Sequence, residues 1–150
     1  MLKKVIGTIW RKLTPSLRLR IVRLTQKQFT VSVAAVIFNE NDEVLLLDHV
    51  LRPAAPSWGF PGGFLEHREQ PVDAVRRELR EETGIELTDV ELIRLRTSNG
   101  HIEILFRAES NDVAAVKSRE INAARWFKVS ALPENISRKQ RELIKNLLKN

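Results

Sequence analysis

Residues 71–83 constrain the fold of this chain more than any other segment, because residues typical of helix boundaries stand at both ends and predict a helix between them. Pro71 stands at a first-turn position, where its missing N–H is not needed, and Gly84 follows as a residue suited to a left-handed cap. The stretch 29–38 is rich in β-branched and apolar residues, as is typical of a buried strand. A helix flanked by strands predicts a layered α/β or α+β domain.

Other segments carry weaker strand and helix patterns. The turn residues 39–42 and an apolar run at 43–47 predict a hairpin with the first strand. Prolines and glycines between 53 and 63 predict an irregular loop. The remaining strands are expected near Val90–Arg96, His101–Arg107 and Ala124–Val129, and a final helix near Arg138–Leu148.

The positive charge of the chain is concentrated at one end. The 150 residues include 25 Lys or Arg and 19 Asp or Glu, for a net charge of +6. Residues 1–28 hold eight of these cations and no acid, so the rest of the chain holds 17 cations and 19 acids, a net of −2. A basic chain ordinarily suggests a nucleic-acid partner, but this distribution weakens that inference. We expect a basic arm at 1–28 and a domain at 29–150.

The start of the arm has the spacing of an amphipathic helix, which Pro15 ends or redirects. Such a stripe fits a membrane surface, an apolar patch of its own domain, or a second subunit in a homo-oligomer. Packing against protein is the commoner fate of amphipathic helices, so we favour it over membrane contact. The apolar residues of the stripe are Leu2, Val5, Ile6, Ile9, Trp10 and Leu13, opposite Lys3, Lys4, Arg11 and Lys12.

Several classes of protein are disfavoured by what the sequence lacks. It contains no cysteine, which excludes disulfides, thiolate metal sites and cysteine nucleophiles. No apolar run approaches the roughly 18–20 residues that span a bilayer, and no secretory signal pattern is visible. A cytoplasmic location is the expectation.

Three carboxylates are predicted to share one face of the helix at 71–83. Glu78 lies one turn from both Glu81 and Glu82. Like charges at this spacing repel, and a bound magnesium, manganese or calcium ion would offset the repulsion. On this cluster alone, a solvated acidic face is an equally good interpretation. Its balancing cations would be Arg76, Arg77 and Arg80.

The wider spacing resembles the Nudix box, G-x5-E-x7-R-E-U-x-E-E-x-G-U, where U is an aliphatic residue. The chain is thus similar to Nudix hydrolases, most strongly over 63–85 and more loosely over about 29–130. A match at nine specified positions makes chance improbable. The matching residues are Gly63, Glu69, Arg77, Glu78, Leu79, Glu81, Glu82, Gly84 and Ile85.

The resemblance implies an α/β/α sandwich with a mixed sheet and a magnesium-dependent pyrophosphohydrolase, with manganese as a possible substitute. Such enzymes use metal-activated water to cleave a nucleoside diphosphate from another moiety, as in nucleoside triphosphates or nucleotide sugars. Glu78 and Glu82 would be the principal metal ligands. Glu81 would be a third ligand or a close neighbour of the metal, and the Gly62 carbonyl would complete the set. The structural pair in the box would be Glu69 and Arg77.

The catalytic base and the substrate contacts stay open. Glu120, in a loop before a predicted strand, competes with Glu81 for the role of base, although an exposed loop glutamate is a plain alternative. Arg52 could grip a distal phosphate, and Phe29 or Trp58 could stack on a base, but surface arginines and core aromatics are common. A second interpretation of the whole chain is a Nudix-fold module that binds nucleotide or RNA or regulates another protein. A third is an RNA 5′-end pyrophosphohydrolase.

Overall fold

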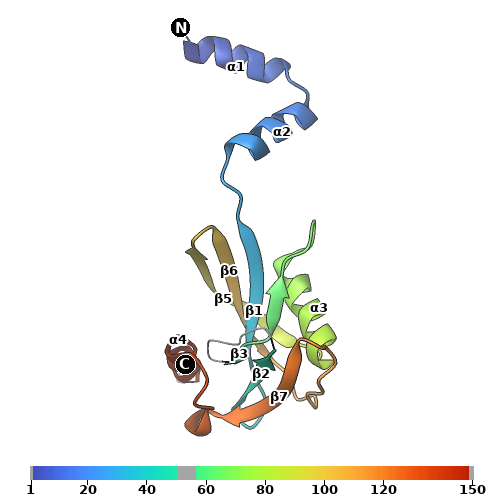
Figure 1. The fold of residues 1–150 in the computed structure, drawn as a ribbon, viewed down its shortest axis with the longest axis vertical. Coiled ribbons are helices and arrows are strands. Elements are labelled where there is room, and N and C mark those ends of the chain that lie inside the picture. Colours follow the sequence, from blue (N-terminus) through green and yellow to red (C-terminus); the bar gives the residue numbers. More distant parts are fainter. Residues whose placement is uncertain (1, 51–56, 149–150) are drawn as a thin grey trace. The chain divides into compact units, whose positions relative to one another are not determined.

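The N-terminal basic segment folds as two helices (Figure 1). The computed structural model describes the backbone of residues 2–50 and 57–148 and the side chains from Ile6 onward. Helix α1 spans Leu2–Lys12 and helix α2 spans Pro15–Thr25. Proline fits the first turn of α2, and the Thr14 hydroxyl caps this helix by accepting a hydrogen bond from the Leu17 N–H. Pro15 therefore begins a second helix immediately after α1.

The chain divides into two compact units, Met1–Thr30 and Val31–Asn150. The second unit is built on a mixed sheet, whose strand order is β3-β2-β1-β6-β5, with β4 paired to β1 and β7 paired to β2. Its strands are β1 Thr30–Phe38, β2 Glu43–His49, β3 Trp58–Gly59, β4 Gly62–Phe64, β5 Thr88–Ser98, β6 His101–Glu109 and β7 Ile121–Lys128.

Two helices cover opposite faces of this sheet, α3 (Pro71–Thr83) and α4 (Arg138–Leu147), and a short 3-10 turn at Val129–Ala131 precedes α4 (Figure 1). Successive β1 side chains point to alternate faces. Val33, Ala35 and Ile37 belong to the core beneath α3, whereas Val36 and Phe38 belong to the core beneath α4. Burial on both faces explains why the run is apolar throughout. The predicted α/β/α sandwich with a mixed sheet is confirmed.

The prediction for residues 53–63 was wrong in part. The hairpin of β1 and β2 is confirmed by the antiparallel pairing of Phe38 with Val44. Residues 53–56 of the expected irregular loop lie outside the described residues, but its remainder contains two short strands, with Gly59 opposite Leu47 and Gly63 opposite Val33. Glycines and prolines break local patterns, so pairing with strands more than ten residues earlier leaves no local signal. This pairing matters because it places β4 beside α3.

No helix among the described residues is long and apolar enough to cross a membrane.

Candidate active site

Two glycines of β4 allow its backbone to approach the acidic face of α3. Gly62 has φ +145°, a conformation that residues with a side chain rarely adopt, and a Cβ there would collide with the backbone of Val33 and Ala34. A Cβ at Gly63 would overlap the carboxylate of Glu78. The space that a side chain would fill is thus taken up by neighbouring backbone at Gly62 and by a carboxylate at Gly63.

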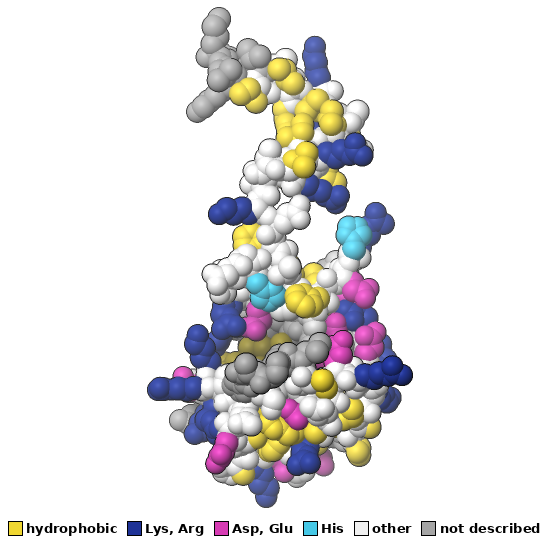
Figure 2. Space-filling view, viewed as in Figure 1, with side chains coloured by type: hydrophobic (Ala, Val, Ile, Leu, Met, Phe, Trp, Pro, Cys, Tyr) yellow, Lys and Arg dark blue, Asp and Glu magenta, His cyan; other side chains and the backbone are white. Residues whose placement is uncertain are grey.

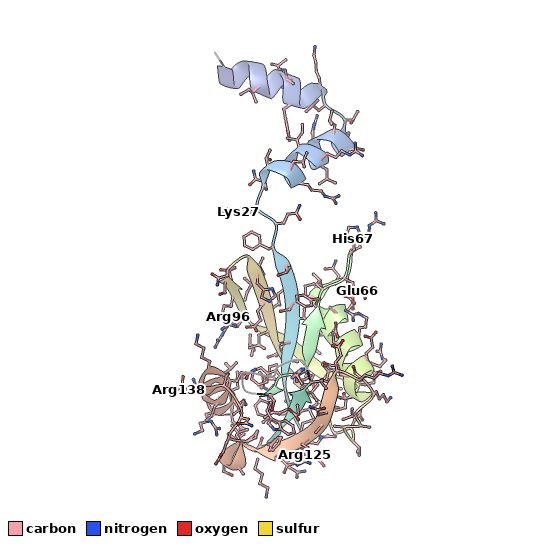
Figure 3. All side chains as sticks on the ribbon, viewed as in Figure 1. Lys27, Glu66, His67, Arg96, Arg125 and Arg138 are labelled. Atoms are coloured by element: carbon pink, nitrogen blue, oxygen red, sulfur yellow. The ribbon has the colours of Figure 1, made fainter. Side chains whose placement is uncertain are left out.

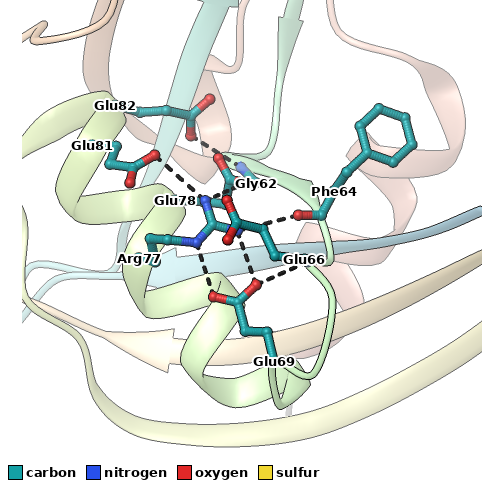
Figure 4. A network of polar contacts seen from close by, with 8 residues as sticks. All are labelled: Gly62, Phe64, Glu66, Glu69, Arg77, Glu78, Glu81 and Glu82. Carbon is teal, nitrogen blue, oxygen red and sulfur yellow. Dashed lines mark hydrogen bonds and ion pairs between the residues drawn. The ribbon is translucent and has the colours of Figure 1, made fainter.

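Arg77 is the centre of the polar network on α3 (Figure 4). Its Nε and Nη2 atoms donate to the two oxygens of Glu69 at 2.8 and 3.0 Å, which is the bidentate geometry of a strong ion pair. Its Nη1 donates to Glu78 Oε1 at 2.9 Å and to Glu81 Oε2 at 3.4 Å. Nη2 also donates to the Phe64 carbonyl at 3.2 Å, so one guanidinium joins the helix to the preceding loop.

The carboxylates differ in their surroundings. Hydrogen bonding from Arg77 holds the pKa of Glu69 below its usual range. Burial raises the pKa of Glu78, although the hydrogen bond and charge of Arg77 act in the opposite direction. Glu82 is buried and accepts a hydrogen bond from the Gly62 N–H at 3.1 Å. Glu81 is largely exposed. The cluster therefore contains both sheltered and accessible carboxylates.

Glu120 reaches the same site from a distant part of the chain. The Lys117 N–H donates to the Glu82 carbonyl at 2.9 Å, which ties the loop before β7 to the end of α3. The Val50 N–H donates to the Glu120 carbonyl at 2.8 Å, which fixes Glu120 beside the end of β2. These backbone contacts hold the chain around Glu120 near the end of α3, and Glu120 lines the same cavity as the α3 glutamates.

These acids surround one open cavity of about 380 Å³. Glu78, Glu81, Glu82 and Glu120 all line it, together with Gly62, Gly63 and Arg77. Acidic side chains also gather on the side of the domain where α3 lies (Figure 2). Glu66 lines the cavity as well, and it lies beside His67 in the loop between β4 and α3 (Figure 3). Most of the predicted site residues are therefore brought together.

The predicted substrate contacts are placed differently. Trp58 packs edge-on against Phe127, with ring centroids 5.0 Å apart, on the core beneath α4. Phe29 is exposed and belongs to the N-terminal unit. Neither is among the residues that line the cavity in the described part of the chain. Arg52 lies outside the described residues.

Four cavity residues were missed by the sequence analysis: Phe64, Leu65, Glu66 and Ser118. Ser118 lines the cavity beside Glu120, and Phe64 lines it with 65% of its surface exposed. The Phe64 ring meets His101 edge-on, with a centroid distance of 6.1 Å. Phe64 meets the site through its carbonyl, which accepts from Arg77, whereas its ring points away from the glutamates (Figure 4).

The donor set suits a hard divalent cation, since it consists of carboxylate and carbonyl oxygens. Residues 2–50 and 57–148 nevertheless contain no group of three acidic or histidine side chains already arranged as a metal cage. The contacts above give the reason, because Arg77 engages Glu78 and Glu81 while the Gly62 N–H engages Glu82. The residue types are therefore suitable ligands for such a cation, but their side chains would have to reorient to bind it.

The alternative of an acidic face balanced by arginines receives only partial support. Arg76 donates to the Leu87 carbonyl, and Arg80 pairs with Glu86 at 2.7 Å. Of the three arginines on α3, only Arg77 has hydrogen bonds or ion pairs to the glutamate cluster in the described structure. A single cation facing Glu69, Glu78 and Glu81 leaves excess negative charge at the cavity.

Comparison with known proteins gives the family. The model of the NUDIX domain matches residues 28–147. The chain belongs to the Nudix family. A MutT-like protein of Streptomyces ambofaciens is 32% identical over 116 residues, covering 76% of this chain and 71% of that protein. The 8-oxo-dGDP phosphatase of Danio rerio is 30% identical over 114 residues, covering 72% of this chain.

This Nudix chain spans only 35% of the length of the Danio rerio relative. A solved structure, the MutT NUDIX hydrolase from Burkholderia pseudomallei, superposes with a TM-score of 0.68 at 25% identity, covering 79% of this chain and 97% of that one. The fold of residues 28–147, which includes α3 and its glutamates, is therefore the fold of the Nudix family.

Two glycine substitutions should distinguish a role in the active site from a role in stability. Gly63→Ala should lower hydrolytic activity with little loss of stability, because its Cβ meets only the movable end of Glu78. Gly62→Ala should lower the free energy of unfolding by about 2 kcal/mol or more, because a strained φ and backbone overlap oppose it. Thermal unfolding and turnover, measured on both variants, check this. Equal losses of stability would contradict the assigned close approach of Glu78 to Gly63.

Proposed function

We propose that this Nudix chain is a magnesium-dependent pyrophosphohydrolase that cleaves a phosphoric anhydride of a nucleotide substrate. The observation that carries the proposal is the convergence of five acidic residues on one cavity: three from α3, one from the loop before β7 and one, Glu66, from the loop before α3. Membership of the family supports the reaction class. Manganese is the expected substitute for magnesium, because it accepts the same hard oxygen ligands.

Glu78, Glu82 and the Gly62 carbonyl would hold the cation, and Glu81 would be a third ligand or hydrogen-bond to a ligand. When bound, the cation would polarise phosphate oxygens and lower the pKa of the attacking water. Gly62 and Gly63 let the β4 backbone lie against β1 and against the Glu78 carboxylate, which would bring the Gly62 carbonyl close to the α3 ligands. The Arg77 guanidinium would keep Glu69 and the preceding loop fixed while Glu78 and Glu81 turn towards the cavity.

Glu120 is the proposed general base. It lines the cavity together with the α3 glutamates, and its main chain is held at both the carbonyl and the N–H, the latter donating to Ser118 Oγ at 3.2 Å. A positioned main chain with a movable carboxylate suits the removal of a proton from water at the reacting phosphorus. Glu81 is the alternative, since it lines the same cavity and is also exposed.

Glu120→Gln should slow turnover by about 100-fold while leaving the fold unchanged, because the amide cannot accept the proton. Steady-state rates with saturating magnesium measure this, and Glu81→Gln is the comparison. If Glu120→Gln turns over normally and Glu81→Gln does not, the role of base belongs to Glu81.

The proposed substrates include several classes of nucleotide that share one reactive bond. Nucleoside triphosphates, oxidised nucleoside diphosphates and nucleotide sugars all carry the required anhydride. A panel of these compounds with a 5′-triphosphorylated RNA, incubated with protein and magnesium, tests the proposal. Release of phosphate, pyrophosphate or a nucleoside monophosphate supports it, whereas tight binding without products would favour a binding module.

A further inference from the structure

The arm, residues 1–28, leaves large apolar side chains uncovered. Ile6 and Ile9 are each 56% exposed, and Leu24 is 86% exposed. None of the residues of α2 is buried. Uncovered aliphatic side chains in two successive helices are costly in water, so they point to a surface that accepts them.

The cations of the arm surround this apolar surface and have no acidic counterpart within it. The arm contains eight Lys or Arg and no Asp or Glu. Figure 2 shows hydrophobic and basic side chains on the helices of this unit. The helical spacing sets the apolar residues of α1 on one side, with Lys3 and Lys12 at the two borders. Such a border places the ammonium groups level with the headgroups when the apolar side is inserted.

The junction of the two helices is fixed by one of these cations. Arg18 Nη2 donates to the Arg11 carbonyl at 2.8 Å, and α2 is capped by Thr14. The helices are therefore joined by a defined corner, and their exposed residues include Trp10, whose indole prefers the interface between apolar and polar layers.

The sequence alone favours packing against protein, but from this combination of exposed apolar residues and unbalanced cations we infer that the arm binds the surface of an anionic lipid bilayer. Insertion of an apolar face and attraction of a polybasic segment are the two signals that together give stable attachment at a membrane surface. A second copy of the arm fits less well, because two segments with eight cations each would repel one another. A nucleic acid would neutralise the cations but leave the apolar residues in water.

The test uses the full chain and sedimented vesicles of phosphatidylcholine, with or without phosphatidylserine. Ile6→Ser combined with Ile9→Ser keeps every charge, and Arg11→Gln combined with Lys12→Gln keeps the apolar side. The matched control is Leu92→Ser with Leu95→Ser, which alters two residues of β5 that are each 60% exposed. All substituted side chains are exposed, so each variant is expected to fold.

We expect the unaltered chain to bind only the anionic vesicles, and each arm variant to bind at least about tenfold more weakly, from the loss of apolar contact or of charge. The control should bind normally. Two results would overturn the inference. In one, the Ile6 and Ile9 variant binds normally and an oligonucleotide displaces the vesicles, which indicates a polyanion site. In the other, no vesicle binds and that variant converts a dimer to a monomer on a sizing column, which indicates a second copy.

Discussion

Replacing Glu82 by glutamine is expected to reduce magnesium-dependent turnover by about three orders of magnitude or more, because the proposed cation supplies most of the charge stabilisation in the transition state. The fold should survive. Glu82 accepts a hydrogen bond from the Gly62 N–H at 3.1 Å, and the glutamine carbonyl oxygen can accept the same bond. The loss of one negative charge also relieves repulsion with Glu78.

Glu86→Gln is the matched control for this variant. Glu86 is an exposed glutamate a short distance along the chain, and it pairs with Arg80 rather than with the cavity. Rates and thermal unfolding should be measured for both variants. Glu86→Gln should have close to normal rates. A well-folded Glu82→Gln protein with full activity would remove Glu82 from the proposed site.

Replacing Arg77 by alanine is expected to have the largest effect on stability. Arg77 pairs with Glu69 at 2.8 Å and with Glu78 at 2.9 Å, and all three side chains are mostly buried. Without the guanidinium, the carboxylates face one another without a cation. We expect the free energy of unfolding to fall by about 2–3 kcal/mol, and turnover by about 100-fold because the loop before α3 loses its anchor.

Arg80→Ala is the control, since Arg80 is half exposed and pairs with the exposed Glu86. Its loss should change the melting temperature little, because the ion pair is exposed to solvent. Magnesium should raise the melting temperature of the Arg77→Ala protein more than that of the unaltered chain, because a cation at the cavity offsets the same carboxylates. An equal response in the two proteins would argue that magnesium does not bind at Glu78 and Glu81.

Helices and strands were predicted correctly where their own residues mark their ends or their burial. Helix α3 begins at Pro71 and ends at Thr83, and Gly84 caps its last turn with φ +75°, as the residue types indicate. The apolar run of β1 was equally clear, because burial on both faces removes polar residues from the pattern. The shared face of Glu78, Glu81 and Glu82 follows from helical periodicity alone.

Long-range contacts could not be predicted in this way. The strand β4 forms because its backbone finds β1, and the position of Glu120 depends on main-chain bonds to Val50 and from the loop at Lys117 to α3. The side chain of Trp58 likewise could not be placed from the sequence. An aromatic residue beside a strand is consistent with either a base-stacking site or the core, and only its contact with Phe127 locates it.

The carboxylates of this cavity are proposed to support metal-dependent hydrolysis of a phosphoric anhydride. The most direct measurement follows turnover of the best panel substrate in isotopically labelled water, before and after chelation and on return of magnesium. Turnover is expected to stop with chelation, to return with magnesium or manganese, and to place the label in one phosphate product. Turnover that continues unchanged without a divalent cation, or products that contain no labelled oxygen, would contradict it.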